Sequence, residues 1–281
     1  MRGMRCLLWA LLAVGWLAGS GGVAGERPGG ITLVGRLVQG GLVIGHAPGC
    51  TAVRLDGREI AMDEERRFVF GFGRDARRDH LLEAECAGRT VRRPLVVAER
   101  HFPIERVNGL PERSVTLPPE DLARRKREIA AIVRARAVHS DLEEVFAGFR
   151  RPAAGRISGV YGAQRVLNGK PRTPHYGLDI AARAGTPVVA PAGGIVRLVG
   201  DFLLEGRIIV IDHGMGVTST LFHLKDIVVR EGERVRQGQL IGHVGQTGRA
   251  TGPHVDWRVN WGAVRIDPAL ALALAPAKAA P

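Results

Sequence analysis

Three polar side chains alternate with apolar ones in the segment His254-Val255-Asp256-Trp257-Arg258-Val259. Such period-two alternation is typical of a half-buried strand, whose successive side chains point to opposite faces of the sheet. His254, Asp256 and Arg258 are therefore expected on one face, with the apolar side chains between them facing a core. Imidazole and carboxylate groups bind metals, so this strand would project two metal-capable groups side by side. An ordinary strand with a solvated polar face fits the same pattern.

Several other catalytic and binding motifs are absent from the sequence or incomplete. The chain contains no His-Glu-x-x-His helix motif and no Gly-x-Ser-x-Gly elbow, which excludes helical zinc proteases and serine hydrolases of those kinds. The turn Gly245-Gln246-Thr247-Gly248 lacks the Gly-Lys-hydroxyl ending of a phosphate-binding loop, so we reject nucleotide binding there. His213, at a predicted junction of strand and turn, is expected to have a structural hydrogen-bonding role. His243 is not expected to bind metal.

Length and composition favour a mostly β protein of about two domains. The chain has 281 residues, of which 45% are hydrophobic and only 5% aromatic, together with 38 glycines and 16 prolines. Such a chain can bury a substantial core, and its mixture of residues suits short strands joined by turns.

The N-terminus is predicted to be a secretory signal peptide covering residues 1–25. Arg2 and Arg5 precede an apolar run over residues 7–18, and small residues follow up to Gly25. The run is shorter than the ~20 apolar residues of a membrane-spanning helix, although retention as an anchor stays open. The small residues directly after the run include no cysteine, so a lipoprotein anchor is not expected. The predicted location is the periplasm or cell envelope.

The formal net charge of +12 indicates anionic partners, and export would exclude nucleic acid. Envelope polymers and phospholipid headgroups remain, which allows peripheral contact with a membrane. Removal of residues 1–25 would leave two cysteines, Cys50 and Cys86. They form a disulfide in an oxidising compartment or stay as two buried thiols, and the sequence leaves both states open.

Residues 26–117 are predicted to form a small β-sandwich-like domain without catalytic residues. Alternating and β-branched segments separated by glycine turns indicate strands. The predicted strands are 31–38, 51–55, 68–72, 81–86 and 90–97.

Residues 118–151 are predicted to form a helical connector. Acids follow Pro118 and arginines precede Ala137, as the helix dipole favours, with an apolar stripe of Leu122, Ile129, Ile132 and Val133. Ser140 to Glu143 match a capping box that would start a second helix ending near residue 149. The basic run 124–127 is interpreted as a solvated helix face. The sequence Arg150-Arg151-Pro152 marks the predicted domain boundary.

Residues 152–275 are predicted to be a second β domain, followed by a tail over 276–281. Its glycine-punctuated strands are expected at 188–190, 195–199, 207–211, 217–223, 227–229, 240–244 and 254–259.

A string of short motifs runs through this second domain. The motifs, in chain order, are Gly155-Arg156-Ile157-Ser158, Tyr161-Gly162, His175-x-x-x-Asp179, Gly185-Thr186-Pro187-Val188, Ile211-Asp212-His213-Gly214, His223-Leu224, Gly238-Gln239-x-Ile241-Gly242 and Gly252-Pro253-His254. This string resembles peptidase family M23, also called the LytM or lysostaphin-like domain. The resemblance implies an antiparallel β fold with a groove and one zinc ion, and active members of the family cut peptide cross-links of bacterial peptidoglycan.

Carried over by position, the resemblance assigns a role to five residues. His175 and Asp179 resemble the first two zinc ligands, while His223 and His254 match two histidines that assist the reaction without binding metal. The third ligand is a histidine in the family, and here its place is taken by Asp256. The usual tyrosine two residues before His223 is also replaced, by leucine. One histidine would accept a proton from the attacking water, and the other would stabilise the developing oxyanion.

Aspartate is an admissible third ligand because carboxylate oxygen binds zinc at ~2.0 to 2.2 Å, much as imidazole nitrogen does. Its shorter reach requires the ion or the strand to shift, or a water to bridge. Two aspartates also make the zinc site formally neutral, so bound water would be less acidified than at a positive site. Such a site would accept manganese more readily.

The sequence thus predicts an exported zinc endopeptidase that acts on peptidoglycan. The alternative is a catalytically degenerate LytM-like module that activates a cell-wall amidase or scaffolds divisome and other envelope proteins. The replacement at Asp256 is the main feature that favours the alternative.

Overall fold

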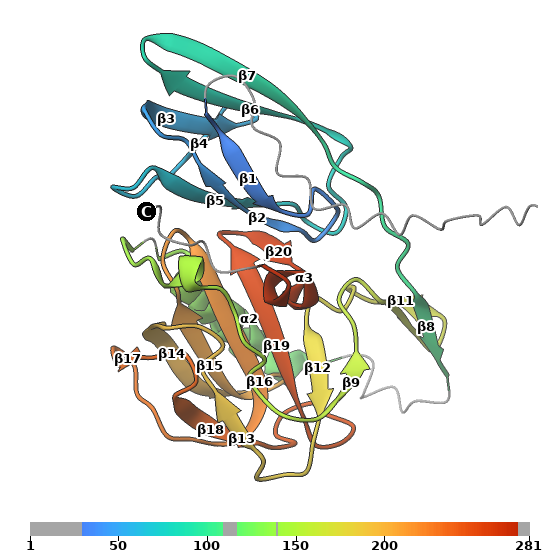
Figure 1. Ribbon diagram of the computed structural model, residues 1–281. Helices are drawn as coiled ribbons and strands as arrows, with labels where there is room; N and C mark the ends of the chain where they lie inside the picture. The colour runs from blue at the N-terminus through green and yellow to red at the C-terminus, as the bar shows by residue number, and fades with distance from the viewer. Residues whose placement is uncertain (1–29, 109–116, 139, 275–281) are drawn as a thin grey trace, which may run out of the picture.

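The computed structural model describes residues 30–108, 117–138 and 140–274. The predicted signal peptide and the predicted tail lie outside these residues. Figure 1 shows an N-terminal lobe, coloured blue to teal, stacked on a C-terminal lobe that runs from green to red. Within the described residues, no helix is both long and apolar enough to cross a membrane.

The N-terminal lobe consists of two small antiparallel sheets, one with strand order β1-β2-β5 and one with order β4-β3-β6-β7. A disulfide joins Cys50 to Cys86 across β3 and β6. The strands are β1 (Thr32–Gly35), β2 (Leu42–His46), β3 (Cys50–Leu55), β4 (Arg58–Ile60), β5 (Arg67–Gly71), β6 (Asp79–Cys86) and β7 (Arg89–Val96).

All five strands predicted for this lobe are present, with shifted ends, but β2 and β4 were not predicted. In β2 the apolar run Leu42-Val43-Ile44 is buried throughout. The strand therefore lacks the period-two alternation on which its prediction would depend.

The C-terminal lobe is built on a ten-stranded sheet whose main order is β17-β14-β15-β16-β19-β12-β9. Its pairings are antiparallel, which confirms the predicted mostly β fold class. The strands are β9 (Arg156–Gly159), β12 (Leu178–Ala181), β13 (Pro187–Val189), β14 (Gly194–Phe202), β15 (Gly206–Asp212), β16 (Val217–Ile227), β17 (Arg234–Val235), β18 (Leu240–Val244), β19 (His254–Trp261) and β20 (Val264–Ile266).

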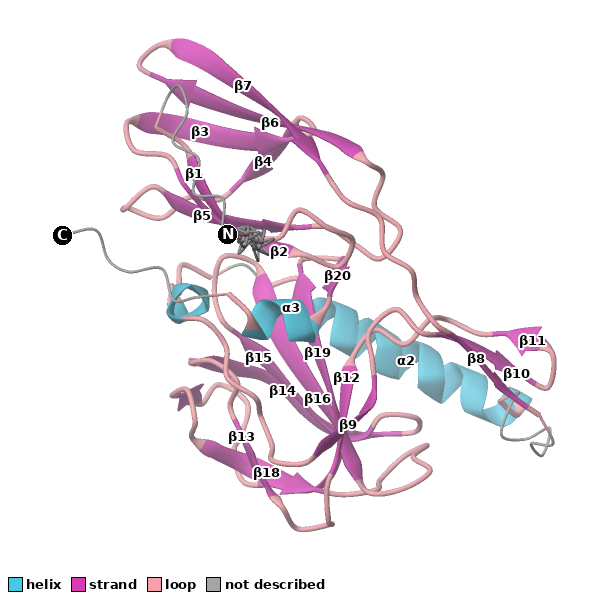
Figure 2. Cartoon of the chain, turned by 45° about the vertical axis from the view of Figure 1, so that its right-hand side comes forward, coloured by secondary structure: helices cyan, strands magenta, loops and turns pink. Residues whose placement is uncertain are grey.

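The two faces of this sheet are covered differently (Figures 1 and 2). One face carries Leu221, Trp257 and Val259 into a core that is continuous with the core of the N-terminal lobe. The lobes are also joined by an ion pair of 2.8 Å between Arg100 and Asp267. The short helix α3 (Pro268–Leu272) follows β20. The other face carries the candidate site.

Helix α2 (Pro119–Arg136) lies on that second face, as the cyan helix behind the strands in Figure 2 shows. Its ends agree with prediction, with acids in the first turn and arginines in the last. Ile132 and Ala135 pack with Phe222 and two other side chains of the sheet. Of the predicted apolar stripe only Ile132 is buried, whereas Leu122, Ile129 and Val133 are exposed.

The predicted second helix is also wrong. Only a 3₁₀ turn, η1 (Glu144–Ala147), forms there, and it has no side-chain cap. The Ser140 hydroxyl instead donates a hydrogen bond of 2.8 Å to the Asp212 carboxylate of the sheet. Because this contact uses the hydroxyl for a distant partner, the expected capping box does not form.

A small third sheet links regions that the sequence placed in separate domains. Strand β8 (Ile104–Val107) pairs in parallel with β10 (Gln164–Leu167), which also pairs with β11 (Lys170–Pro171). The first predicted region therefore contributes a strand beside the C-terminal lobe, and the predicted domain limits stay a proposal.

Candidate metal centre

Two adjacent strands and the loop before one of them bring three metal-capable side chains together. Asp179 of β12 and Asp256 of β19 are direct cross-strand partners. His175 precedes β12 by three residues. One donor atom from each of the three side chains lies within 4.8 Å of the others, and all three residues are buried.

Two of the candidate donor atoms, one on His175 and one on Asp179, fit a metal ion by their burial and their lack of hydrogen bonds within the described chain. His175 Nε2 lies 3.1 Å from Asp179 Oδ1, and neither buried atom has a hydrogen-bond partner among the described residues. Four tetrahedral ligands at ~2.0 to 2.2 Å from zinc would be ~3.3 to 3.6 Å apart. The spacing of this pair is therefore near that of ligands sharing an ion, and buried polar atoms require some partner.

Two glycines make room for the carboxylates. A Cβ at Gly177 would lie only 1.9 Å from Asp256 Oδ1, and a Cβ at Gly159 would lie 2.3 Å from Asp179 Oδ2. Real Cβ atoms do not approach other atoms so closely, so any larger residue at either position would displace a candidate ligand. We had not predicted this role of either glycine, and one sequence shows no signal for it.

His223 is placed by an irregularity in β16. Its backbone has a φ of 65°, which is uncommon for a residue other than glycine, and the pairing register of β16 shifts nearby. Bulges of this kind turn a side chain away from its regular direction. The ring Nδ1 lies 2.8 Å from the carbonyl oxygen of Thr247. Burial lowers the pKa of His223 more than the nearby Asp256 charge raises it.

His254 lies beside His223, with the ring centroids 4.7 Å apart. Its Nδ1 lies 2.8 Å from the carbonyl oxygen of Gly252. A carbonyl can only accept a hydrogen bond, so in both histidines Nδ1 carries the proton. In the neutral rings Nε2 is consequently left as a proton acceptor. Nε2 of His254 lies 4.0 Å from Asp179 Oδ1.

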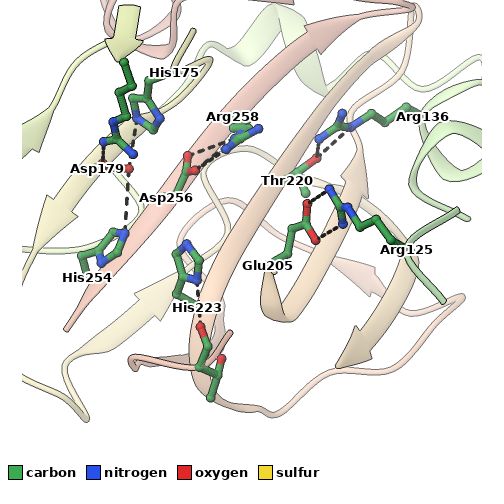
Figure 3. Close-up of polar contacts among 12 residues, drawn as sticks. Arg125, Arg136, His175, Asp179, Glu205, Thr220, His223, His254, Asp256 and Arg258 are labelled. Atoms are coloured by element: carbon green, nitrogen blue, oxygen red, sulfur yellow. Dashed lines mark hydrogen bonds and ion pairs between the residues drawn. The ribbon is translucent and has the colours of Figure 1, made fainter. Parts of the chain in front are cut away.

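Arg258 holds Asp256 through its guanidinium (Figure 3). Arg258 Nη2 lies 2.7 Å from Asp256 Oδ2, and Nε lies 3.0 and 3.2 Å from the two carboxylate oxygens. Burial raises the pKa of Asp256, but the charges of Arg258 and His175 outweigh it and hold that pKa below its usual range. The alternation of β19 predicted that Arg258 shares the face of Asp256, but not this ion pair.

Three further residues named in the sequence analysis have structural contacts outside the candidate ligand cluster. The buried His213 places Nδ1 2.6 Å from the carbonyl oxygen of Gly193. His243 instead contacts Asp226 at 2.6 Å. Trp257 is fully buried on the core face and donates its indole N–H to Ser219.

Helix α2 forms one side of the site region, as Figure 3 shows with Arg136 beside Thr220 and Arg125 beside Glu205. Arg125 makes a two-pronged ion pair with Glu205, with distances of 2.5 and 2.8 Å. The interpretation of the basic run as a solvated face is therefore wrong for Arg125. Its partner Glu205 lies 80 positions away, so sequence alone could not pair them.

Fold and site together define a class of antiparallel β domain with a candidate metal centre and two adjoining histidines. Residues 173–268 match the family described as Peptidase family M23. An M23 peptidase of known crystal structure from Pseudomonas aeruginosa is 31% identical, with a TM-score of 0.65 over 84% of this chain and 95% of its own. The chain therefore belongs to peptidase family M23.

Two curated relatives match over smaller parts of their length. The peptidoglycan DD-endopeptidase ShyA of Vibrio cholerae is 30% identical over 194 residues, which are 67% of this chain and 41% of ShyA. The DD-carboxypeptidase/endopeptidase Mpg of Neisseria meningitidis is 39% identical over 94 residues, which are 34% of this chain and 22% of Mpg. The chain thus spans less than half of either relative.

Proposed function

We propose that this protein is a zinc metalloendopeptidase that hydrolyses peptide cross-links of peptidoglycan. The observation that carries the proposal is the buried cluster of His175, Asp179 and Asp256 beside two histidines with matching tautomers. Membership of a peptidase family supports the class of reaction. The name of ShyA, a peptidoglycan DD-endopeptidase, supports peptidoglycan peptides as the substrate, and the name of Mpg supports peptidase activity.

His175, Asp179 and Asp256 would hold the metal ion. When bound, zinc supplies a Lewis acid that polarises a carbonyl group and lowers the pKa of water. With two aspartates the site is formally neutral, but the guanidinium of Arg258 adds one positive charge next to Asp256. Counted with Arg258, the zinc site has an overall charge of about +1. This is the charge that zinc with two histidines and one aspartate would have.

His223 and His254 would handle protons during the reaction. In both rings Nδ1–H donates a hydrogen bond to a backbone carbonyl, so Nε2 of each ring is free of a proton and can act as a base. The lowered pKa of His223 keeps its ring neutral and able to accept a proton near neutral pH. One Nε2 takes a proton from the attacking water and passes it to the leaving amine as the C–N bond breaks. The other ring takes a second proton from solvent on Nε2, and that N–H donates a hydrogen bond to the developing oxyanion. The backbone carbonyls fix both rings and reduce the cost of orienting them.

The same geometry disfavours the alternative of a degenerate binding module. Loss of catalysis would relax the positions of His223 and His254, yet both rings are held by backbone contacts and lie next to each other. We also propose, from the predicted signal peptide, that the protein works in the periplasm or cell envelope. An amidase or divisome partner is not part of the proposal.

Digestion of purified peptidoglycan tests the proposed reaction. The protein incubated with zinc is expected to release cross-linked peptides as monomers, detected by liquid chromatography and mass spectrometry. His223→Ala is expected to lower the rate by ~10²-fold or more, since a general base contributes ~10² to 10⁴. His243→Ala, a histidine outside the site, serves as the matched control. Equal digestion by the wild type and His223→Ala would contradict the proposed role of His223.

A further inference from the structure

Three arginines from separate elements gather beside the candidate metal centre. Arg258 of β19 lies two positions beyond Asp256 on the same face of the strand. Arg265 of β20 is the cross-strand partner of Asn260, which continues that face. Arg136, the last residue of α2, donates to the hydroxyl of Thr220 at 2.9 and 3.1 Å. Thr220 is in turn the direct cross-strand partner of Arg258.

The positive charge of this cluster exceeds the negative charge near it. Asp256 is the carboxylate that pairs with Arg258, while the more distant Glu205 is taken by Arg125. Arg136 is buried and has only the Thr220 hydroxyl as a hydrogen-bond acceptor within the described chain. Burial, followed by the charges of Arg265 and Arg258, lowers the pKa of Arg136 to about 9. Buried charge without a counter-charge is costly and is retained where it serves a purpose.

Arg265 is the arginine of the cluster best placed to meet a ligand. Among the described residues it has no ion pair, and its guanidinium lies over the ring of Tyr176 at 5.4 Å. It lines a cavity of about 350 Å³ between the lobes, together with Tyr176 and the turn of residues 73–76. Tyr176 directly follows the candidate ligand His175 in the chain, so one residue connects the lining of the cavity to the metal centre.

A second observation on the same face also indicates a missing partner. The side-chain oxygens of Thr218 and Asn260 are buried and have no hydrogen bond within the described part of the chain. These two residues are cross-strand partners, and each lies two positions along its strand from Thr220 or Arg258. Buried polar atoms of this kind normally find a partner in a ligand or an ordered water.

We propose that Arg136, Arg258 and Arg265 form a subsite for a free carboxylate of the substrate, close to the scissile bond. The proposal rests on the proposed peptidase function and specifies its substrate class. Guanidinium groups present a planar fork of donors that matches a carboxylate. Because Arg258 contacts the candidate ligand Asp256 directly, the bound carboxylate would belong to a residue that forms the scissile bond or to its neighbour.

Calorimetric titration with two matched peptides tests the subsite without needing turnover. The peptides are N-acetyl-D-alanyl-D-alanine and the same dipeptide with a terminal carboxamide. They are titrated into the zinc-incubated full chain carrying His223→Ala. The acid is expected to bind at least ~tenfold more tightly than the amide, the usual effect of a hydrogen bond to a charged group.

Variants of Arg265 separate the subsite from direct binding of the carboxylate to metal. Arg265→Gln in the same background is expected to abolish the preference for the acid. If Arg265→Gln does not fold, Arg265→Lys takes its place in the test. The lysine keeps the positive charge but lacks the planar pair of donors, so the preference for the acid over the amide should fall at least ~threefold. Arg230→Gln, an exposed arginine between β16 and β17, is the matched control for net charge.

Three results would overturn the subsite: equal affinity for acid and amide, no binding of either peptide, or a preference that survives both changes at Arg265. Digestion of peptidoglycan by the wild type judges the peptidase function separately. A protein that digests peptidoglycan but binds both peptides equally would therefore retain the proposed function and lose only the subsite.

Discussion

At the scale of single residues, the site depends on groups that are not themselves candidate ligands. Arg258 compensates the charge of Asp256, and the missing side chains of Gly177 and Gly159 leave room for the two carboxylates. The proposed metal site with Asp256 as a ligand therefore depends on several residues together. The aspartate brings a negative charge, and the arginine two positions later neutralises it.

Gly177→Ala tests the space around Asp256. The added methyl would lie 1.9 Å from Asp256 Oδ1, so the carboxylate must move. Metal affinity is expected to fall at least ~tenfold, the effect seen when groups around a metal site are disturbed, and competition with a chromophoric chelator measures it. Gly73→Ala, where φ is likewise outside the positive range and a Cβ would meet only Val264 at 3.8 Å, is the matched control for adding a methyl group. Equal losses in both variants would contradict the proposed crowding.

Arg258→Met tests the ion pair. Removing the arginine leaves the buried carboxylate of Asp256 without its partner in the metal-free protein, which should destabilise the fold by about 3 to 5 kcal/mol. Urea unfolding in the presence of a chelator measures this loss. Adding Asp256→Asn is expected to recover part of the stability because no uncompensated charge remains. An unchanged midpoint for Arg258→Met would show that solvent already screens the pair.

At the scale of elements, residues at the ends of strands connect neighbouring elements across the core, and His213 is one of these residues. It follows β15, contacts the carbonyl of Gly193, and stacks edge-on against Phe149 after η1. Burial lowers the pKa of His213 from 6.5 to about 4. The unfolded chain therefore binds a proton below pH 6.5 while the folded chain stays neutral.

The stability contributed by His213 should be complete above pH 6.5 and be lost as the pH falls towards 4. The total loss is about 3 kcal/mol, from ~1.4 kcal/mol for each unit of pKa difference. Urea unfolding at a series of pH values measures it, and His213→Gln is expected to flatten the slope in this window. An equally steep slope in that variant would assign the acid sensitivity to other groups.

At the scale of the whole molecule, two lobes share a continuous core, and the disulfide between Cys50 and Cys86 cross-links the N-terminal lobe. Replacing Cys50 and Cys86 by alanine removes a link between residues 36 positions apart. The loss of loop constraint should cost about 3 to 4 kcal/mol. Calorimetric melting of the double variant measures it, and an unchanged melting temperature would contradict a stabilising role.

Local patterns predicted much of this molecule, and contacts between distant residues account for the failures. Alternation located β19 and the polar face of Asp256, and charge placement located α2. The second helix failed because Ser140 bonds to distant Asp212. Of the predicted stripe on α2 only Ile132 is buried, because the helix turns Ile132 and Arg136 towards partners on the sheet. A single sequence contains no signal for such pairings.

The metal content of the protein purified from Glu26 onward is the most direct test of the candidate centre. Elemental mass spectrometry after incubation with zinc and manganese is expected to find about one ion per chain. His175→Ala should lose that ion, while His243→Ala, outside the cluster, should keep it. A wild-type chain that stays free of metal under these conditions would contradict the metallopeptidase assignment.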